Sequence, residues 1–203
     1  MSTAASTPRV RGARTREALV AGARRVFERD GFLEARIADI AAESGVATGS
    51  FYTHFDSKEA AFAAVIDEVH EETLHPRLEV THSTDDPIAV IEAAHRDYLL
   101  AYRRNAKLMA LLEQVALIDE DFRRLRLDRV HLMARRNAKT IRRLQDKGLA
   151  DPGLDPLSTA HALNGMVSRM ANLVFVHGER IGFDSLLATL TALWANALRI
   201  PAR

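Results

Sequence analysis

The stretch GFLEARIADIAAESGVATGSFYTHFDSKE, residues 31–59, decides the fold of this chain. Its apolar residues recur at helical spacing in two short segments, about 37–44 and 48–55, on either side of a tight turn at Ser44-Gly45-Val46. The second segment is too short to be stable alone and is rich in small polar and aromatic side chains. We therefore expect one side of it to pack on a core and the other side to contact something outside the fold.

The composition is that of an ordinary globular protein. The 203 residues are 47% hydrophobic and 27% charged, which suffices for one large domain or two small ones. The absence of cysteine excludes disulfides and thiolate chemistry. There is neither an apolar run of about 20 residues nor a signal-peptide core, so we expect a cytoplasmic protein with no membrane partner.

The net charge of +1 hides an uneven distribution. Arg9, Arg11, Arg14 and Arg16 all precede the first acidic residue, Glu17. We expect residues 1–13 to form a flexible basic arm, which can follow a phosphate backbone or enter a minor groove. A solvated tail explains the same residues, and the sequence leaves both interpretations open.

Helical periodicity covers nearly the whole chain, and no stretch alternates as a strand does. Gly31 is expected to end the first helix and Thr48 to cap the third. Asp56 with Glu59 predicts a capping box for the fourth helix, and Asp86-Pro87 marks the next start. The expected fold is all-α with about nine helices, over residues 14–30, 37–44, 48–55, 56–78, 87–104, 106–117, 119–147, 156–177 and 183–199.

The first helices contain the spacing of a small helical core. Val46, Phe51, Phe55 and Phe62 are placed to pack against Phe27 and Ile40 and to close a three-helix unit. This packing leaves hydroxyl and small side chains of the third helix outside. Hydroxyls can contact bases or phosphates, and Gly49 would let the backbone come close to a duplex, so the major groove of DNA is the expected partner.

Residues 15–69 resemble the N-terminal DNA-binding domain of the TetR family of bacterial transcriptional regulators. The residues that carry the resemblance keep a specific order and spacing over about a quarter of the chain: Phe27, Gly31, Phe32, Ile40-Ala41-Ala42, Gly45-Val46, Gly49-Ser50-Phe51-Tyr52-Thr53-His54-Phe55 and Ser57-Lys58-Glu59. The resemblance implies a helix-turn-helix DNA-binding domain over residues 14–60, followed by a helical ligand-binding and dimerisation domain over 61–203, with helix four spanning the boundary. It further implies a homodimer, most often a repressor, that binds a palindromic DNA operator and is released by a small-molecule effector.

The resemblance also assigns roles to single residues. It places Tyr52, His54 and Lys58 at phosphates, although a packing tyrosine and a plain surface histidine are the alternatives for the first two. The expected DNA-binding residues are Arg36, Thr48, Gly49, Ser50, Tyr52, Thr53, His54 and Lys58.

One position departs from the family pattern. The family usually begins its second helix with Thr followed by Thr or Ser, where this chain has Ala35 and Arg36. Loss of the hydroxyl cap costs about 1 kcal/mol. Arg36 can replace its phosphate contact with a charged one or can read a base; we hypothesise the phosphate contact.

The last two helices have broad apolar faces that suit a four-helix dimer interface, although internal core packing explains them too. The expected interface residues are Met166, Met170, Val174, Leu186, Leu190, Leu193, Trp194 and Ala197.

The effector site is expected among the helices of the same domain. His161, Asn164, Ser168 and Asn172 form a polar line that is either a pocket wall, a hydrogen-bonded interface or a solvent edge. Apolar and aromatic neighbours would suit an apolar or acyl-like effector, although core packing explains them equally well. The expected effector residues are Tyr98, Tyr102, Met109, Leu112, Glu113, Asn164, Ser168 and Asn172.

The helix over 119–147 has eight arginines, from Arg123 to Arg143. A salt-bridged solvent face, a second nucleic-acid surface and a site for an anionic headgroup are the three interpretations, and the first is the commonest.

An enzyme is the rival class. The string His70-Glu71-Glu72-Thr73-Leu74-His75 spaces its histidines five apart, so they do not share a helix face as a zinc protease requires. We expect no catalytic residue, no metal and no cofactor. A helical adaptor that binds only protein would leave the basic arm and the exposed third helix without a purpose.

Overall fold

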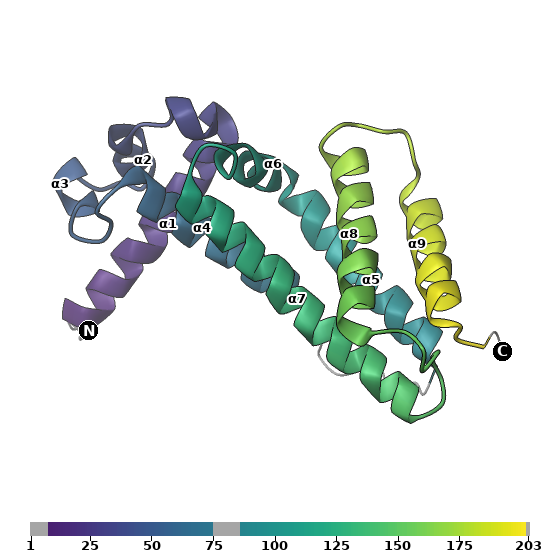
Figure 1. Ribbon diagram of the computed structural model, residues 1–203. Coiled ribbons are helices and arrows are strands. Elements are labelled where there is room, and N and C mark those ends of the chain that lie inside the picture. Colours follow the sequence, from purple (N-terminus) through teal and green to yellow (C-terminus); the bar gives the residue numbers. More distant parts are fainter. Residues whose placement is uncertain (1–7, 75–85, 202–203) are drawn as a thin grey trace, which may run out of the picture. The chain divides into compact units, whose positions relative to one another are not determined.

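The computed structural model describes the backbone of residues 8–74 and 86–201 and the side chains of residues 12–72 and 86–201. Over these residues the chain is helical and contains no strand, so the all-α prediction is confirmed (Figure 1). The helices are α1 (Pro8–Glu34), α2 (Ile37–Glu43), α3 (Thr48–Phe51), α4 (Lys58–Leu74), α5 (Pro87–Arg104), α6 (Ala106–Val115), α7 (Glu120–Asp146), α8 (Pro156–Phe175) and α9 (Phe183–Leu198).

The chain folds as two compact units, Met1–Val69 and His70–Arg203. The division falls inside α4, so this helix belongs to both. Its expected extension to residue 78 and most of the following loop lie outside the described residues.

Helix α1 starts earlier than the sequence predicts. It begins at Pro8, so the residues from 8 to 13 are helical and the expected flexible arm is wrong for them. Proline suits a first helical position because the missing N–H has no intrahelical partner there. Gly31 interrupts α1 with φ 79° and ψ 176°, a backbone conformation that L-residues avoid. The prediction that Gly31 ends the first long helix is therefore confirmed, and a short helical turn follows it.

Two predicted helix caps are wrong by one residue. Ala47, not Thr48, is the N-cap of α3, and its side chain cannot cap. At α4 the Ser57 hydroxyl accepts a hydrogen bond from the Ala60 N–H at 3.1 Å, so Ser57 takes the role expected of Asp56. The cap at α5 is as predicted, since Asp86 accepts from the Ile88 N–H at 3.0 Å.

Aromatic side chains fill the core of the first unit. Phe27 and Phe32 each lie 5.0 Å from Phe62 between ring centroids. Phe51 of α3 is fully buried, and Phe55 is 5% exposed. Val46 is only half-buried. The expected three-helix core is thus formed, with phenylalanine rings packed among aliphatic side chains such as Leu19, Val26 and Ile40.

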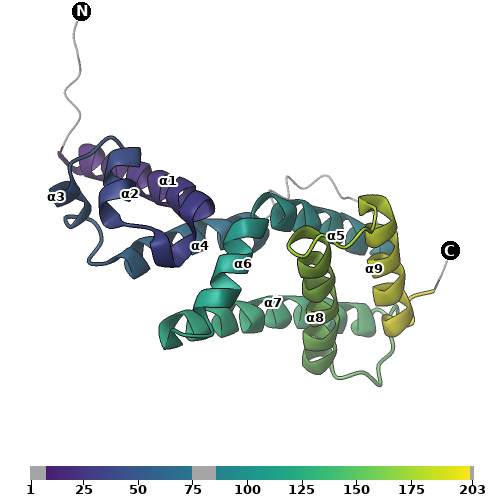
Figure 2. The same cartoon turned by 90° about the horizontal axis from the view of Figure 1, so that it is seen from above.

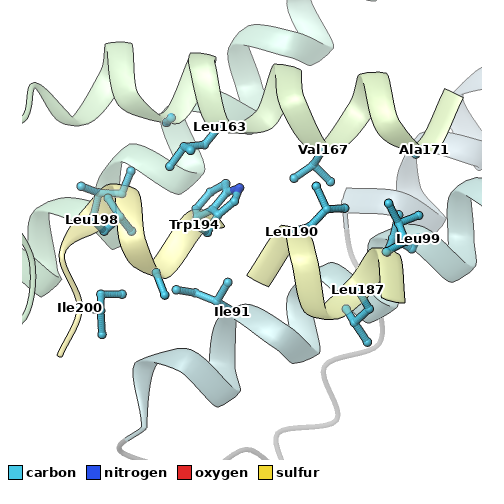
Figure 3. Close-up of a cluster of buried hydrophobic side chains, with 14 of the residues drawn as sticks. Ile91, Leu99, Leu163, Val167, Ala171, Leu187, Leu190, Trp194, Leu198 and Ile200 are labelled. Atoms are coloured by element: carbon cyan, nitrogen blue, oxygen red, sulfur yellow. The ribbon is translucent and has the colours of Figure 1, made fainter. Parts of the chain in front are cut away.

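In the second unit α5 packs against both α8 and α9, while α7 packs against α8 and α6. Figure 2 shows α8 crossing α7. Figure 3 shows the core between α5, α8 and α9, where the Trp194 ring points toward Leu163 and Val167. Most of this core comes from the apolar faces of helices at helical spacing, as the sequence predicts, while Ala150 and Ile200 lie outside the helices.

Two polar side chains, His95 and Thr191, are buried beside this core. His95 is 6% exposed, lies edge-to-face with Trp194 at 5.2 Å and has Nδ1 3.4 Å from the Thr191 hydroxyl oxygen. Burial lowers the pKa of His95 to about 4. Burial, with a smaller effect of Arg129, also lowers the pKa of His70 to about 4.

These histidines predict that the second unit is less stable in acid. The pKa of each histidine is about 6.5 in the unfolded chain and about 4 in the folded chain. Between these pH values the histidines of the unfolded chain therefore bind more protons. The free energy of unfolding therefore falls as the pH drops from about 6.5 to about 4, by up to about 3 kcal/mol for each histidine. Urea unfolding followed by the fluorescence of Trp194, the only tryptophan, measures this. His95→Gln should reduce the dependence of the free energy of unfolding on pH. His177→Gln, at an exposed position, is the control and should leave this dependence unchanged.

Candidate functional site

A tight turn joins α2 to α3. Gly45 has φ 69°, and the Val46 N–H donates to the Ala41 carbonyl at 3.0 Å. The Ser44 hydroxyl donates to the Ile40 carbonyl at 2.6 Å, which satisfies one of the last acceptors of α2. The predicted turn is confirmed, and its backbone fixes the direction in which α3 starts.

The turn also depends on a close approach between α1 and α2. A Cβ added to Gly22 would lie 2.1 Å from the Ser44 hydroxyl oxygen and 3.2 Å from the Ile40 carbonyl oxygen. Only glycine leaves the end of α2 this near to α1. The sequence shows this glycine but gives no sign of its role, because its neighbour is 22 residues away.

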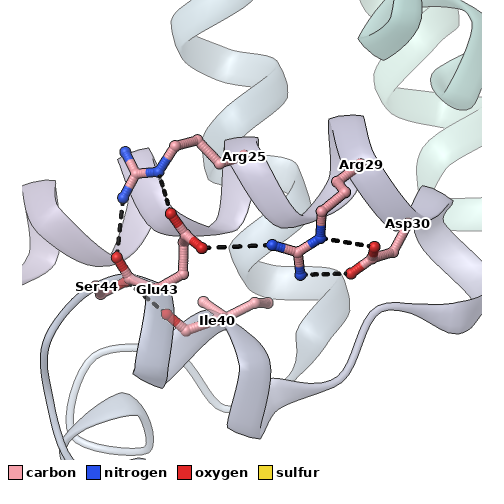
Figure 4. A network of polar contacts seen from close by, with 6 residues as sticks. All are labelled: Arg25, Arg29, Asp30, Ile40, Glu43 and Ser44. Carbon is pink, nitrogen blue, oxygen red and sulfur yellow. Dashed lines mark hydrogen bonds and ion pairs between the residues drawn. The ribbon is translucent and has the colours of Figure 1, made fainter.

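Charged groups fasten the same two helices on the outside (Figure 4). Arg25 donates to the Glu43 carboxylate at 2.7 Å and to the Glu43 carbonyl at 2.9 Å. Arg29 donates to Glu43 at 3.4 Å and makes two 2.8 Å bonds to Asp30. The hydrogen bond from Arg25 holds the pKa of the Glu43 carboxyl below its ordinary value. The pairs are exposed, so each contributes little to stability, but together they restrict the orientation of α2.

The expected helix over 48–55 is shorter, since α3 ends at Phe51 and a turn follows, but the segment still divides its residues between core and solvent. Phe51 and Phe55 point into the core, and the Phe51 ring lies 5.7 Å from that of Phe55. Tyr52, which the alternative interpretation treats as a packing residue, is 56% exposed. The other expected contact residues of this segment are exposed (Thr48, Gly49, Thr53) or half-buried (Ser50, His54). One face of α3 is therefore anchored and the opposite face is open.

Two cations of the expected DNA-binding region pack on phenylalanine rings. The Arg16 guanidinium lies 5.1 Å from the centroid of Phe55. Lys58 lies 4.8 Å from the centroid of Phe32 and donates to the Leu33 carbonyl at 3.1 Å. An ammonium has three donors, so this bond leaves Lys58 with capacity for a further acceptor.

Arg36 occupies the N-cap position of α2, with no hydrogen bond from its side chain to the helix. The predicted loss of the hydroxyl cap is confirmed. Its neighbour Ala35 is 3% exposed, and Arg36 itself is exposed. Arg36 therefore places a positive charge beside the open N–H groups of α2, where an anion is favoured.

In the second unit two tyrosines gather polar partners. The Asn172 amide donates to the Tyr102 hydroxyl at 3.4 Å, and the ring centroids of Tyr98 and Tyr102 are 5.9 Å apart. Burial raises the pKa of both tyrosines, the Ser168 hydroxyl opposes this at Tyr98, and the Glu113 charge adds to it at both. Five of the eight expected effector residues thus influence one another.

The remaining expected effector residues are placed differently. Leu112 is 2% exposed, and Met109 is half-buried against the core of the second unit. Asn164 accepts from the Asn137 amide at 2.7 Å, which ties α8 to α7, and the Asn164 amide nitrogen has no partner among the described residues. The polar line on α8 therefore faces its own protomer at Asn164 and Asn172.

The expected dimer residues also divide into two groups. Leu186, Leu190 and Trp194 are at most 7% exposed inside this protomer, so they are unavailable to a partner. Leu193 is 45% exposed and Ala197 is exposed, while Met166, Met170 and Val174 are half-buried. The apolar faces are wide enough for internal packing, and only their outer edges remain open.

Two further observations concern the described residues as a whole. They contain no group of three or more His, Cys, Asp or Glu side chains that could hold a metal ion. None of the helices in residues 8–74 and 86–201 is long and apolar enough to cross a membrane.

Residues 19–65, which contain α2, the turn and α3, match the family model for bacterial regulatory proteins of the tetR family. This part of the chain is a TetR-family helix-turn-helix domain. None of the curated proteins compared with it matches.

Solved structures share the TetR-like fold over nearly the whole chain. A TetR-like transcriptional regulator from Rhodococcus sp. RHA1 is 21% identical, with a TM-score of 0.68 over 90% of this chain and 94% of that one. The fatty acid degradation regulator FadR from Bacillus halodurans is 16% identical, with a TM-score of 0.76 over 97% and 100%. Salmonella enterica GusR is 18% identical, with a TM-score of 0.73 over 91% and 95%. At these identities the likeness concerns the fold.

The close approach at Gly22 in this TetR-family domain gives a stability prediction. Gly22→Ala should lower the free energy of unfolding by about 1–3 kcal/mol, because the new methyl group overlaps the Ser44 hydroxyl. Thermal melting followed by circular dichroism measures the loss. Adding Ser44→Ala should recover part of it.

Gly49→Ala is the matched control, since a Cβ at Gly49 meets nothing within 4 Å. It should leave the melting temperature unchanged or raise it. Equal losses for Gly22→Ala and Gly49→Ala would contradict the close approach.

Proposed function

We propose that this TetR-family transcriptional regulator is a repressor that binds a palindromic operator as a homodimer and is released by a small-molecule effector. The observation that carries the proposal is the division of α3 between a buried aromatic face and an open polar face. Helix α3 has only four residues, and its exposed polar face adds no stability to the fold unless a partner covers it. The major groove of DNA is such a partner, because it admits one helix. Such a protein acts in the cytoplasm and needs no catalytic group.

The outer edges of α8 and α9 support the dimer. The exposed positions of α9 include Ala188, Ala192, Leu193 and Ala197, and those of α8 include Ala162 and Gly165. Small side chains let helices approach closely, and Leu193 supplies an apolar contact. A two-fold axis through this surface would form the four-helix bundle. The buried leucines of α9 would then hold this surface in place by packing in the core of the same protomer.

The tyrosine pair supports the effector site. Tyr98 and Tyr102 offer hydroxyls among apolar neighbours, with Phe175 at 6.4 Å from Tyr102. An apolar ligand with one hydrogen-bonding group matches this mixture. FadR, a structural neighbour, is named for fatty acid degradation, and an acyl-like effector is the corresponding candidate here.

Within the second unit, a buried amide ties the C-terminal part of α4 to the junction of α5 and α6. Asn105, which is 1% exposed at the junction of α5 and α6, donates to the Glu72 carboxylate at 3.0 Å and to the Ala101 carbonyl at 2.9 Å. The effector would act by favouring a state in which the recognition helices of the dimer are wrongly spaced. A shift of α5 or α6 reaches α4 through this hydrogen bond, and we assign the pair that role.

The DNA-binding proposal is tested with a palindromic duplex taken from beside the chain's own gene. The wild-type protein should prefer it to random duplex. Arg36→Ala should weaken binding to both and reduce the slope of log K against log salt by about 0.9, the value for one phosphate contact.

Arg36→Lys retains the charge and should retain the slope. A change of preference for one base pair, with the slope intact, would show that Arg36 reads a base. Lack of any preference by the wild-type protein would contradict the regulator itself.

Tyr102→Phe tests the effector site by removing one hydroxyl and keeping the ring. A ligand that stabilises the wild-type protein in a thermal-shift screen of metabolites should bind the variant roughly tenfold more weakly, as expected for one lost hydrogen bond of about 1.4 kcal/mol. Tyr52→Phe, the same substitution at an exposed position of the first unit, is the control and should leave the ligand affinity unchanged. Full retention of affinity by Tyr102→Phe would exclude a ligand contact at its hydroxyl.

A further inference from the structure

The two halves of α7 carry their positive charge differently. In the first half Arg123 contacts Glu120 at 2.5 Å, Arg124 contacts Asp121 at 2.6 Å, and Arg126 contacts Glu113 of α6 at 2.8 Å. These arginines fit the ordinary interpretation of a salt-bridged helix face.

In the second half of α7 the positive charges are not matched by nearby acidic residues of the same helix. Residues 130–145 contain five Arg or Lys and no Asp or Glu, and all five cations are exposed. Helix α8, which packs against α7, contains no acidic residue and adds Arg169. Arg135 and Lys139 have no ion-pair partner among the described residues. Arg142 acts on Asp155, whose pKa is lowered first by its hydrogen bonds to Ser158.

Stabilisation of the helix itself does not explain this row. Cations favour the C-terminal end of a helix, but the effect is confined to about the last turn. Arg143 lies in that turn, whereas Arg135 and Lys139 lie two to three turns before the end of α7 at Asp146. The uncompensated charge at these two positions therefore has a different cause.

We propose that the second half of α7, centred on Arg135, Lys139 and Arg142, is a second DNA-binding surface that contacts phosphates without reading sequence. The three cations follow one another at intervals of four and three residues on one side of the helix, about 6 and 4.5 Å along its axis. Each strand of a duplex carries one charge about every 3.4 Å of axis, so a helix lying along the backbone brings each cation near a phosphate.

A membrane surface fits this helix less well. A helix that lies on a bilayer inserts its apolar face between the lipids. The apolar face of α7 is occupied, because Ala134 and Ile141 are at most 1% exposed in the core of the second unit. The exposed large apolar side chains of α7, Leu127, Val130 and Leu132, precede the cations, and none is exposed between Arg135 and Arg143. A DNA phosphate backbone needs only this basic edge.

The test compares two variants of the full-length protein that remove the same charge from the same helix. Arg135→Gln/Lys139→Gln alters the proposed surface, and Arg123→Gln/Arg124→Gln alters the salt-bridged half. Binding to a random-sequence duplex of about 30 base pairs is measured by fluorescence anisotropy between about 50 and 300 mM NaCl. The first variant should reduce the salt slope by about 1.8, at 0.9 for each phosphate contact, and the second should leave it unchanged.

Three results would overturn the proposal. The first variant could keep the wild-type salt slope, or both variants could lose the same amount of slope. Alternatively, Arg135→Gln/Lys139→Gln could weaken binding only to phosphatidylserine vesicles, measured by sedimentation, and not to DNA. Circular dichroism melting confirms that both variants are folded. The preference for the palindrome over random duplex is measured in parallel. A retained preference with an unchanged slope would refute only the second surface, whereas a wild-type protein without preference would refute the operator proposal.

Discussion

Helix α3 depends on the burial of two aromatic rings. It has four residues, too few for its own hydrogen bonds to hold it, and neither its N-cap nor its first residue supplies a side-chain cap. Phe51 and Phe55 therefore fix it by packing, beneath a guanidinium at Arg16 that covers the second ring. Because apolar packing is independent of the polar face, the polar residues from Thr48 to His54 can change while the helix keeps its place.

The position of α2 follows from the same requirement. Its C-terminal end must approach α1 closely enough for the turn to direct α3 onto the aromatic core, and Gly22 makes room for this. Glu43 then accepts hydrogen bonds from Arg25 and Arg29 on the outer side. The packing at Gly22 sets the distance between α1 and α2, and the hydrogen bonds to Glu43 restrict the rotation of α2 about its axis. The two kinds of interaction therefore restrict different motions of α2.

The sequence predicts the helices and the division of residues 48–55 between buried phenylalanines and more open polar side chains well, because both follow from local periodicity and from a motif of nearby residues. It predicts caps less well, since Ala47 and Ser57 differ from the expected residues by a single position that only the backbone decides. It gives no sign of the Gly22 contact or of the Asn105 bond to Glu72, because each joins residues far apart in the chain. The apolar faces of α9 are visible in the sequence, but their division between the core and an open edge depends on where α5 packs.

The second unit combines an apolar core with polar groups that are only partly satisfied. His95 has a long contact to Thr191, and the Trp194 indole N–H has no partner among the described residues. A buried polar group without a good hydrogen bond costs about 1–3 kcal/mol, which narrows the gap between this packing and an alternative one. The proposed effector response requires a small free-energy difference between the two states, because a ligand shifts an equilibrium only by its difference in affinity for them. These weakly satisfied polar groups lie where α5 and α9 pack together, and α5 is the helix that ends at Asn105.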